Sequence, residues 1–170
     1  HVLITGGSKG IGLACAEAFL QEGARVTLVS RDPANLSQGA AKLNTGADRA
    51  ARIFTVSANL RDAADAVRAL DAAEKHFGPV DVLVNSAGAA KRTPAAELTP
   101  EAWQDAMQAK YFTYIHMMDP VVKRMGARQR GVIVNVIGQG GKVASPIHMP
   151  GGAANAALML VTAGTGFAGL

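Results

Sequence analysis

Short apolar runs alternate along this chain with longer segments in which apolar residues recur every three or four positions. The runs, rich in valine, isoleucine and leucine, cover 1–4, 25–30, 51–56, 80–84 and 131–137. Helical spacing, or a recognisable start and stop signal, marks 13–20, 34–43, 62–77, 101–125 and a last segment from 151. Strands of this kind, alternating with helices, are typical of a parallel sheet covered on both faces. The pattern therefore predicts a doubly wound α/β domain of three layers, with strand order 3-2-1-4-5.

The first apolar run leads directly into a glycine-rich turn, 5–12, and then into the first predicted helix. Glycines allow the backbone to approach a pyrophosphate closely, and a helix N-terminus presents free N–H groups to it. A glycine-rich turn alone often only reverses the chain. Its place between a strand and a helix favours a dinucleotide-binding site.

Two motifs, in this order, resemble those of the short-chain dehydrogenases/reductases. The glycine turn matches the cofactor loop of that family, and Asn85-Ser86-Ala87-Gly88, after the fourth run, resembles its second signature. The resemblance covers essentially the whole chain and implies a Rossmann-type domain of an NAD(P)-dependent oxidoreductase. It implies that the cofactor is bound by Gly6, Ser8, Lys9, Gly10, Ile11, Gly12, Ser30, Arg31, Asn59, Leu60, Asn85, Ala87 and Gly88.

The residues at the end of the second predicted strand indicate whether the chain prefers NAD or NADP. An acidic residue there accepts a hydrogen bond from the ribose 2′-hydroxyl of NAD, whereas an arginine nearby accommodates the 2′-phosphate of NADP. This chain has Ser30 and Arg31, and Lys9 lies in the glycine turn. Asp32, followed by Pro33, is typical of a turn or a helix start. We therefore expect NADP(H) to be preferred to NAD(H).

The chain departs from the family at the positions that catalyse its reaction. Relatives use Asn, Ser, Tyr and Lys, and the matching positions here are Lys110, Gly138, Gly151 and Asn155. Glycine has no side chain, so neither Gly138 nor Gly151 can donate a proton or hold a carbonyl. The remaining candidates for catalysis are Lys110, His148 and Asn155, and a solvated loop histidine is an alternative interpretation of His148.

Lys110 falls on an apolar helical stripe that includes Trp103 and Tyr114. An unpaired buried ammonium is costly, and a lysine can extend its head group into a nearby groove. In the family that the chain resembles, the matching position holds an Asn that supports a proton-relay water, so we expect the Lys110 side chain to point at the cofactor groove. Three hypotheses remain: an oxidoreductase with a replaced proton relay, a non-catalytic dinucleotide-binding protein for sensing or assembly, and a short relative without independent activity. Under the first, reduction of simple ketones is expected to be very slow, because a general acid and an oxyanion donor are both replaced.

Composition and charge bound the number of domains and the classes of ligand. The 170 residues suggest a single domain, 1–170, and the formal charge of +4 is scattered, which argues against a nucleic-acid surface. The chain has one cysteine, Cys15, which excludes an internal disulfide and the usual metal-binding spacings, so we expect no metal. Cys15 falls among apolar residues of the first predicted helix, so we expect its thiol to be buried. No apolar run is long enough to span a membrane. We expect a cytoplasmic homodimer or homotetramer that associates through the helices from Glu101 and Gly151.

The ends of the chain carry two further expectations. The chain begins almost inside a strand, and the family resemblance implies additional strands beyond Leu170. We therefore expect a chain that is incomplete relative to the family, and a tail, 163–170, that does not continue the preceding helix.

Overall fold

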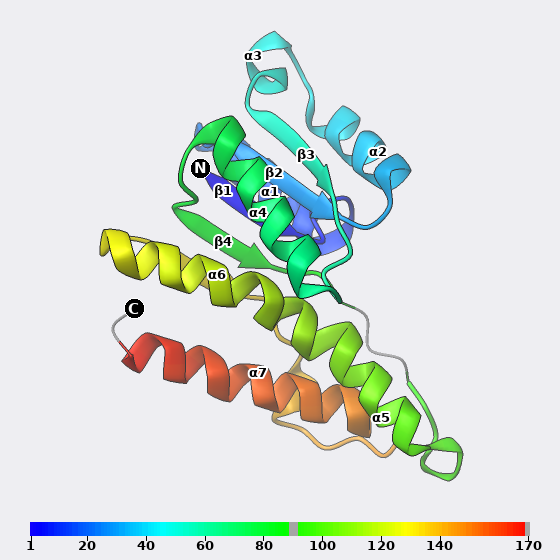
Figure 1. Cartoon of the computed structure of the whole chain (residues 1–170). Helices are drawn as coiled ribbons and strands as arrows, with labels where there is room; N and C mark the ends of the chain where they lie inside the picture. The colour runs from blue at the N-terminus through cyan, green and yellow to red at the C-terminus, as the bar shows by residue number, and fades with distance from the viewer. Residues whose placement is uncertain (89–91, 169–170) are drawn as a thin grey trace.

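The computed structural model describes residues 1–88 and 92–168 and contains a five-stranded parallel sheet of order β3-β2-β1-β4-β5 (Figure 1). The predicted sheet and its strand order are confirmed. The strands, which lie within or close to the five apolar runs, are β1 (Val2–Thr5), β2 (Val26–Ser30), β3 (Ile53–Ser57), β4 (Val82–Asn85) and β5 (Val132–Asn135).

Helices connect the strands and follow the last one, and acceptor side chains mark where several of them begin. The helical elements are α1 (Gly10–Gln21), α2 (Pro33–Leu43), α3 (Ala47–Ala50), α4 (Ala63–Phe77), η1 (Ala95–Glu97), α5 (Pro100–Ala106), η2 (Met107–Phe112), α6 (Thr113–Arg128), η3 (Gln139–Gly141) and α7 (Met149–Phe167). Asp32 caps α2 by accepting hydrogen bonds from Ala34 N and Asn35 N, as its predicted place at a helix start requires. Asp62 caps α4 and Thr99 caps α5 in the same way.

Two hydrophobic cores lie on opposite faces of the sheet, which gives the predicted three layers. On one face, Leu3 and Leu83 pack with residues of α4, α6 and α7. On the other face, Ile4 and Leu28 pack with residues of α1 and α2. Figure 1 shows α4 and α6 in front of the sheet and α1 behind it. No helix of the described residues is long and apolar enough to cross a membrane.

Three local features differ from the sequence prediction. The predicted helix 101–125 is divided into α5, the π-helical η2 and α6, and the short helix α3 was not predicted. The tail through Phe167 continues α7, because its alanines and threonines remain compatible with a helix despite Gly164 and Gly166.

The fifth strand is less buried than its β-branched sequence predicts. Val132 and Val134 are 55% and 44% exposed. The helices α1 and α2 pack against β1, β2 and β3, so this face of β5 lies beyond the part of the sheet that they cover.

Candidate functional site

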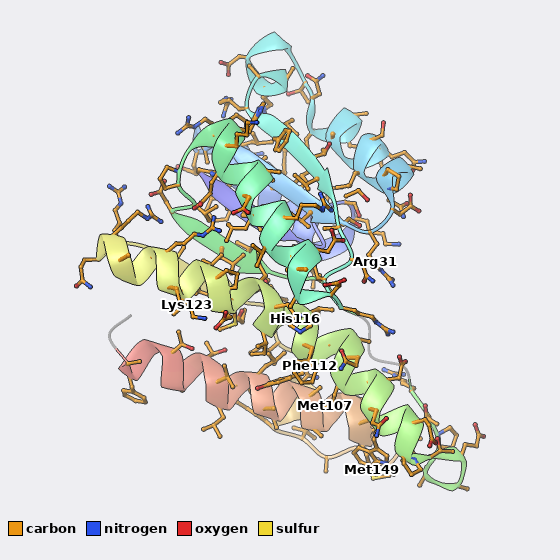
Figure 2. All side chains as sticks on the ribbon, viewed as in Figure 1. Arg31, Met107, Phe112, His116, Lys123 and Met149 are labelled. Carbon is orange, nitrogen blue, oxygen red and sulfur yellow. The ribbon has the colours of Figure 1, made fainter. Side chains whose placement is uncertain are left out.

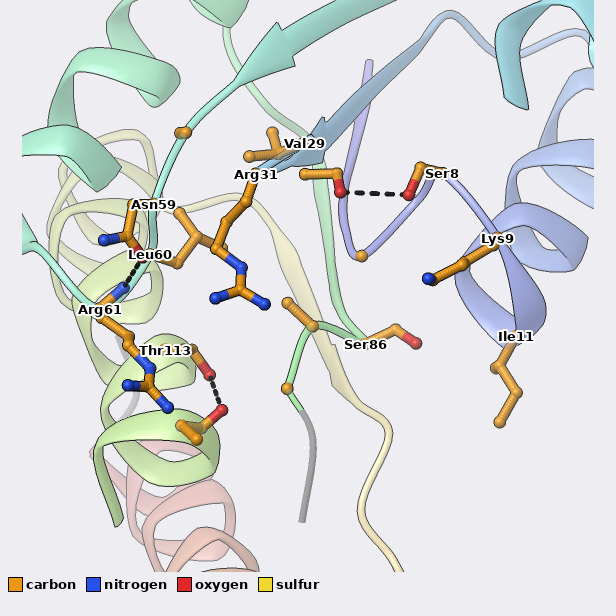
Figure 3. A pocket seen from close by; sticks show the side chains of 16 residues that line it. Ser8, Lys9, Ile11, Val29, Arg31, Asn59, Leu60, Arg61, Ser86 and Thr113 are labelled. Carbon is orange, nitrogen blue, oxygen red and sulfur yellow. Dashed lines mark hydrogen bonds between the residues drawn. The ribbon is translucent and has the colours of Figure 1, made fainter. Parts of the chain in front are cut away.

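A cleft of about 430 Å³ lies at the carboxyl ends of the central strands, where ligands bind in open parallel sheets (Figure 3). The predicted residues that line it are Gly6, Ser8, Lys9, Ile11, Ser30, Arg31, Asn59, Leu60, Ala87 and Gly88. The lining residues that sequence reasoning missed are Val29, Ala58, Arg61, Ser86, Ala109 and Thr113. Arg61 directly follows Asn59 and Leu60, which were predicted to bind the cofactor, so its place in the sequence could have identified it. Ala109 and Thr113 are brought in by helix packing, for which no local motif exists.

The glycine turn leaves no room for a side chain at Gly6 or Gly12. Gly6 has φ +68°, and a Cβ on Gly12 would lie 2.4 Å from the carbonyl oxygen of Gly6. Lys9, the N-cap of α1, makes no side-chain capping bond, so the first N–H groups of α1 have no side-chain cap in the described structure. A helix start of this kind at the edge of a cleft suits a phosphate.

Buried polar side chains hold the strand ends in register beneath the cleft. Thr5, Asn85 and Asn135 pair across β1, β4 and β5. Thr5 Oγ1 donates to Asn85 Oδ1 (3.2 Å), Asn85 Nδ2 donates to Asn135 Oδ1 (3.0 Å), and Asn135 Nδ2 donates to Thr162 Oγ1 (2.8 Å). Thr5 Oγ1 also accepts from Ser86 N and Ala87 N. Asn85, predicted to bind cofactor, is fully buried in this network and does not line the cleft.

The charge of the cleft is positive. Its described lining contains Lys9, Arg31 and Arg61 and no carboxylate. Figure 3 shows Lys9 and Arg31 extending into the cleft from opposite walls, and Figure 2 shows Arg31 projecting beyond the end of the sheet. Ser8 Oγ donates to Ser30 Oγ (3.1 Å) between them, and Arg61 forms an ion pair with Asp105 of α5 (3.0 Å). These groups suit an anionic ligand with a phosphate near Lys9 and Arg31.

Lys110, expected to point at the cofactor groove, lies in the π-helical segment η2 beside this cleft but is not among the residues that line it. A π-turn adds a residue to the helical repeat, and such turns are frequent at functional sites. The methylene Cδ of Lys110 would lie 3.1 Å from a Cβ on Gly88, a lining residue. Lys110 Nζ donates to Tyr114 Oη (2.7 Å) and to the carbonyl oxygen of Val136 (3.2 Å). Figure 2 shows Met107 and Phe112, which bound η2, on the helical run from α5 to α6.

Burial changes the acidity of this pair. Desolvation lowers the pKa of Lys110 from 10.5 to about 8, and desolvation raises the pKa of Tyr114 above its usual value. Tyr114 is fully buried and donates its hydroxyl proton to the carbonyl oxygen of Val136 (2.7 Å). Lys110 is therefore the member of this pair whose proton is transferable near neutral pH.

The other positions that replace the family's catalytic set also come together. Asn155, buried in α7, accepts a hydrogen bond at Oδ1 from Gly138 N (3.4 Å), and its Nδ2 lies 3.0 Å from where a Cβ on Gly138 would be. Gly151 is buried in the first turns of the same helix. His148 occupies the N-cap position of α7 without a side-chain capping bond, and its ring borders Gly140. Within the described chain, no three His, Cys, Asp or Glu side chains are grouped so as to hold a metal ion. The free Cys15 is partly buried in α1.

Comparison with known proteins agrees with this architecture. D-threitol dehydrogenase from Mycolicibacterium smegmatis is 38% identical over 148 residues, which are 86% of this chain and 55% of that protein. An NADPH-bound short-chain oxidoreductase from Pseudomonas aeruginosa PAO1, which contains an atypical catalytic center, has a TM-score of 0.87 and 32% identity, over 94% of this chain and 62% of that one. An actinorhodin polyketide ketoreductase variant with NADPH has a TM-score of 0.92 and 28% identity, over 99% and 64% of the two chains.

The chain thus spans 55% to 64% of the length of these three proteins. A family model described as short chain dehydrogenase matches residues 1–167. The glycine turn, the polar network at the strand ends and the sheet order lie within that match, and the chain belongs to the short-chain dehydrogenase family.

Proposed function

We propose that this chain is an NADP(H)-dependent oxidoreductase whose proton relay is built around Lys110. The observation that carries the proposal is a cleft that is lined by cations, contains no described carboxylate and adjoins a half-buried lysine. Two of the similar structures contain NADPH, which supports the same cofactor here.

The residues of the cleft suit both the pyrophosphate and the 2′-phosphate of NADP(H). The tight turn at Gly6 and Gly12, with the start of α1, would hold the pyrophosphate, because only backbone groups are needed there. Lys9 and Arg31 would pair with a 2′-phosphate, and Asp32 does not compete for that position, since its carboxylate caps α2.

Calorimetric titration with NADPH and NADH tests the cofactor assignment. We expect NADPH to bind more tightly, and Arg31→Ala to weaken NADPH binding about tenfold with little change for NADH, because a charge-assisted pair is lost. Arg25→Ala, at the other end of β2, is the matched control and should leave both affinities unchanged. Equal affinities for the two cofactors, or no loss in Arg31→Ala, would remove the argument.

A nicotinamide cofactor, when bound, supplies or accepts a hydride, and the chain must supply the proton. Lys110 holds its proton at Nζ, and with a pKa of about 8 the ammonium is populated at neutral pH yet gives up its proton readily. Neither Gly138 nor Gly151 can hold the carbonyl oxygen by a side chain, so the reduction of simple ketones should be slow. Asn155 Nδ2 is the neutral donor that remains near this position.

Lys110→Met tests the relay, with Lys123→Met on the exposed part of α6 as the control. Ketone-dependent oxidation of NADPH should disappear in the first variant and persist in the second, while both still bind NADPH. Turnover that survives Lys110→Met contradicts the relay. The absence of turnover in the unchanged chain across ketones, quinones and imines favours the non-catalytic alternative.

We also propose that the chain associates as a homodimer or homotetramer through the α5–α6 run and α7. Trp103 of α5 is 39% exposed, and Leu160 and Phe167 of α7 are 77% and 91% exposed, which leaves apolar side chains to cover. Sedimentation velocity at micromolar concentration should detect a species larger than the monomer, and a monomer alone would count against association.

A further inference from the structure

Three polar groups meet just beyond the carboxyl end of β5, beside η2. Lys110 Nζ donates to Tyr114 Oη (2.7 Å) and to the carbonyl oxygen of Val136 (3.2 Å), and Tyr114 Oη donates to the same carbonyl oxygen (2.7 Å). Val136 comes two residues before Gly138, one of the positions that replace the catalytic set. The three groups therefore form a closed triangle next to the place where the relay acts.

The hydrogen-bonding roles within this triangle are fixed by the groups themselves. A carbonyl oxygen can only accept, so the single hydroxyl proton of Tyr114 is used on Val136. The phenolic oxygen therefore presents its lone pairs to Lys110 Nζ, which is the donor. An ammonium has three N–H donors, and two of them are used here. The third finds no acceptor among the described residues, and it remains for a substrate oxygen or a bridging water.

The hydroxyl of Tyr114 compensates the charge that burial disfavours. Tyr114 is fully buried, and Lys110 Nζ lies 4.3 Å from the centre of its ring. Desolvation is the cause of the lowered pKa of Lys110, and no neighbouring charge in the described chain adds to it. Hydrogen bonds to an ionised group are stronger than bonds between neutral groups, so the hydroxyl favours the ammonium over the free amine.

The elements around η2 bring no competing acceptor to Lys110 within the described chain. Helix α7 has no titratable residue along its length, and neither have β4 and β5. On α5, Asp105 forms an ion pair with Arg61 (3.0 Å), and on α6, His116 Nδ1 donates to the carbonyl oxygen of Leu60 (2.9 Å). The other titratable side chains of α5, η2 and α6 are Glu101, Tyr111, Asp119, Lys123, Arg124 and Arg128. The side-chain acceptor of Lys110 is therefore a neutral hydroxyl and not a carboxylate.

We propose that Tyr114 is a positioning residue for the relay: its hydroxyl anchors the Lys110 head group beside Val136 and leaves one N–H for the substrate oxygen. The proposal rests on the proposed oxidoreductase function and adds the group that controls its lysine. Tyr114 acts through Lys110, because a fully buried side chain cannot touch the substrate. Removal of the hydroxyl alone, with the ring retained, should loosen the head group and disfavour its charge.

NMR of a single labelled tyrosine tests whether Tyr114 senses the proton of Lys110. The chain has two tyrosines, so Tyr111→Phe leaves Tyr114 as the only site for a carbon-13 label at Cζ. We expect this resonance to move with a midpoint near pH 8, and Lys110→Met should abolish the movement. Burial raises the pKa of Tyr114, so its own titration lies above this range. A resonance that stays fixed through pH 8, or that moves equally without Lys110, would overturn the proposal.

Tyr114→Phe removes the hydroxyl and keeps the ring, and Tyr111→Phe is the matched control in the neighbouring position. The rate at which acetic anhydride modifies Lys110, followed by mass spectrometry as the pH is varied, gives the titration midpoint of its amine. We expect the midpoint to fall by about one pH unit in Tyr114→Phe, because a charge-assisted hydrogen bond is lost, and to stay unchanged in Tyr111→Phe. An unchanged midpoint in Tyr114→Phe would mean that the hydroxyl only fills space, and the proposal would fail. The NMR measurement leaves Tyr114 in place, so it does not depend on the folding of Tyr114→Phe.

Ketone-dependent oxidation of NADPH gives a readout of the same contact during turnover. Reduction requires the ammonium, so a midpoint one pH unit lower should reduce kcat/KM about tenfold at pH 9 and about twofold at pH 7. The KM for NADPH should stay the same, because Tyr114 does not line the cofactor cleft. Identical pH profiles for the unchanged chain and Tyr114→Phe would contradict the positioning role.

Calorimetry with NADPH distinguishes the failure of the proposed function from the failure of this proposal. If NADPH does not bind while Tyr114→Phe still lowers the midpoint of Lys110, the oxidoreductase assignment falls and the hold of Tyr114 on the lysine stands. If NADPH binds and is oxidised while the midpoint is the same in Tyr114→Phe, the assignment of Tyr114 falls alone.

Discussion

Replacement of Lys110 by methionine should change how the stability of the protein depends on pH. The pKa of Lys110 falls from 10.5 to about 8 in the folded chain because burial disfavours its charge. Below about pH 8 the amine is protonated in both states, and folding bears the full cost of burying an ammonium. Between about pH 8 and 10.5 the unfolded chain binds more protons than the folded one, so the stability contributed at this position rises with pH.

The magnitude follows from the shift. One pKa unit corresponds to about 1.4 kcal/mol, so the shift sets an upper bound of about 3.4 kcal/mol, and partial exposure to solvent reduces the expected effect to about 1–2 kcal/mol. The free energy of unfolding is measured by urea denaturation of the unchanged chain and of Lys110→Met at pH 7, 8, 9 and 10. We expect the difference, unchanged chain minus variant, to increase by about 1–2 kcal/mol over this range.

Lys123→Met, at an exposed position of α6, shows what the loss of a lysine charge does without burial. The reasoning is refuted if the difference in unfolding free energy between the unchanged chain and Lys110→Met stays constant, or decreases, as the pH rises. It would mean that the hydrogen bonds to Tyr114 and Val136 hold the charge as well as water does. Lys110 would then have no special readiness to give up its proton near neutral pH.

Two further substitutions test the packing of the site. Gly12→Ala should abolish nucleotide binding in calorimetry and lower thermal stability, because its Cβ would lie 2.4 Å from the Gly6 carbonyl oxygen; wild-type affinity would contradict this account of the turn. Gly138→Ser should fail to increase ketone turnover, because its Cβ would lie 3.0 Å from Asn155 Nδ2 and the amide must be displaced; a large increase in turnover would show that the space is free.

The sequence predicted the fold well because its signals there are local and repeated. The apolar runs determine the strands, and Asp32, Asp62 and Thr99 mark helix starts by hydrogen bonds that involve only neighbouring residues. The exposure of Val132 and Val134 was not predictable in the same way. A β-branched run has the same sequence whether or not a helix covers it, so burial at the sheet edge depends on distant elements.

In the candidate site, too, the residues marked by local signals were predicted and those placed by packing were not. The glycine turn and Arg31 were identified because the strand, turn and helix that form the site are contiguous. Ala109 of η2 and Thr113 of α6 reach the cleft only through helix packing, and the π-helical turn that contains Lys110 has no composition signal. Asn85 matches a family motif, yet the structure uses its side chain to hold β4 between Thr5 and Asn135.

A structure of the chain with NADPH bound tests the central claim most directly, through the distance from Lys110 Nζ to the nicotinamide C4 atom. The account predicts that the 2′-phosphate lies between Lys9 and Arg31. It also predicts that Lys110 Nζ is the titratable group nearest C4, close enough to reach a substrate oxygen directly, at about 3 Å, or through one water. A nucleotide bound with Lys110 still turned to Val136 and out of such reach, or with the adenosine ribose away from Arg31, would contradict the account.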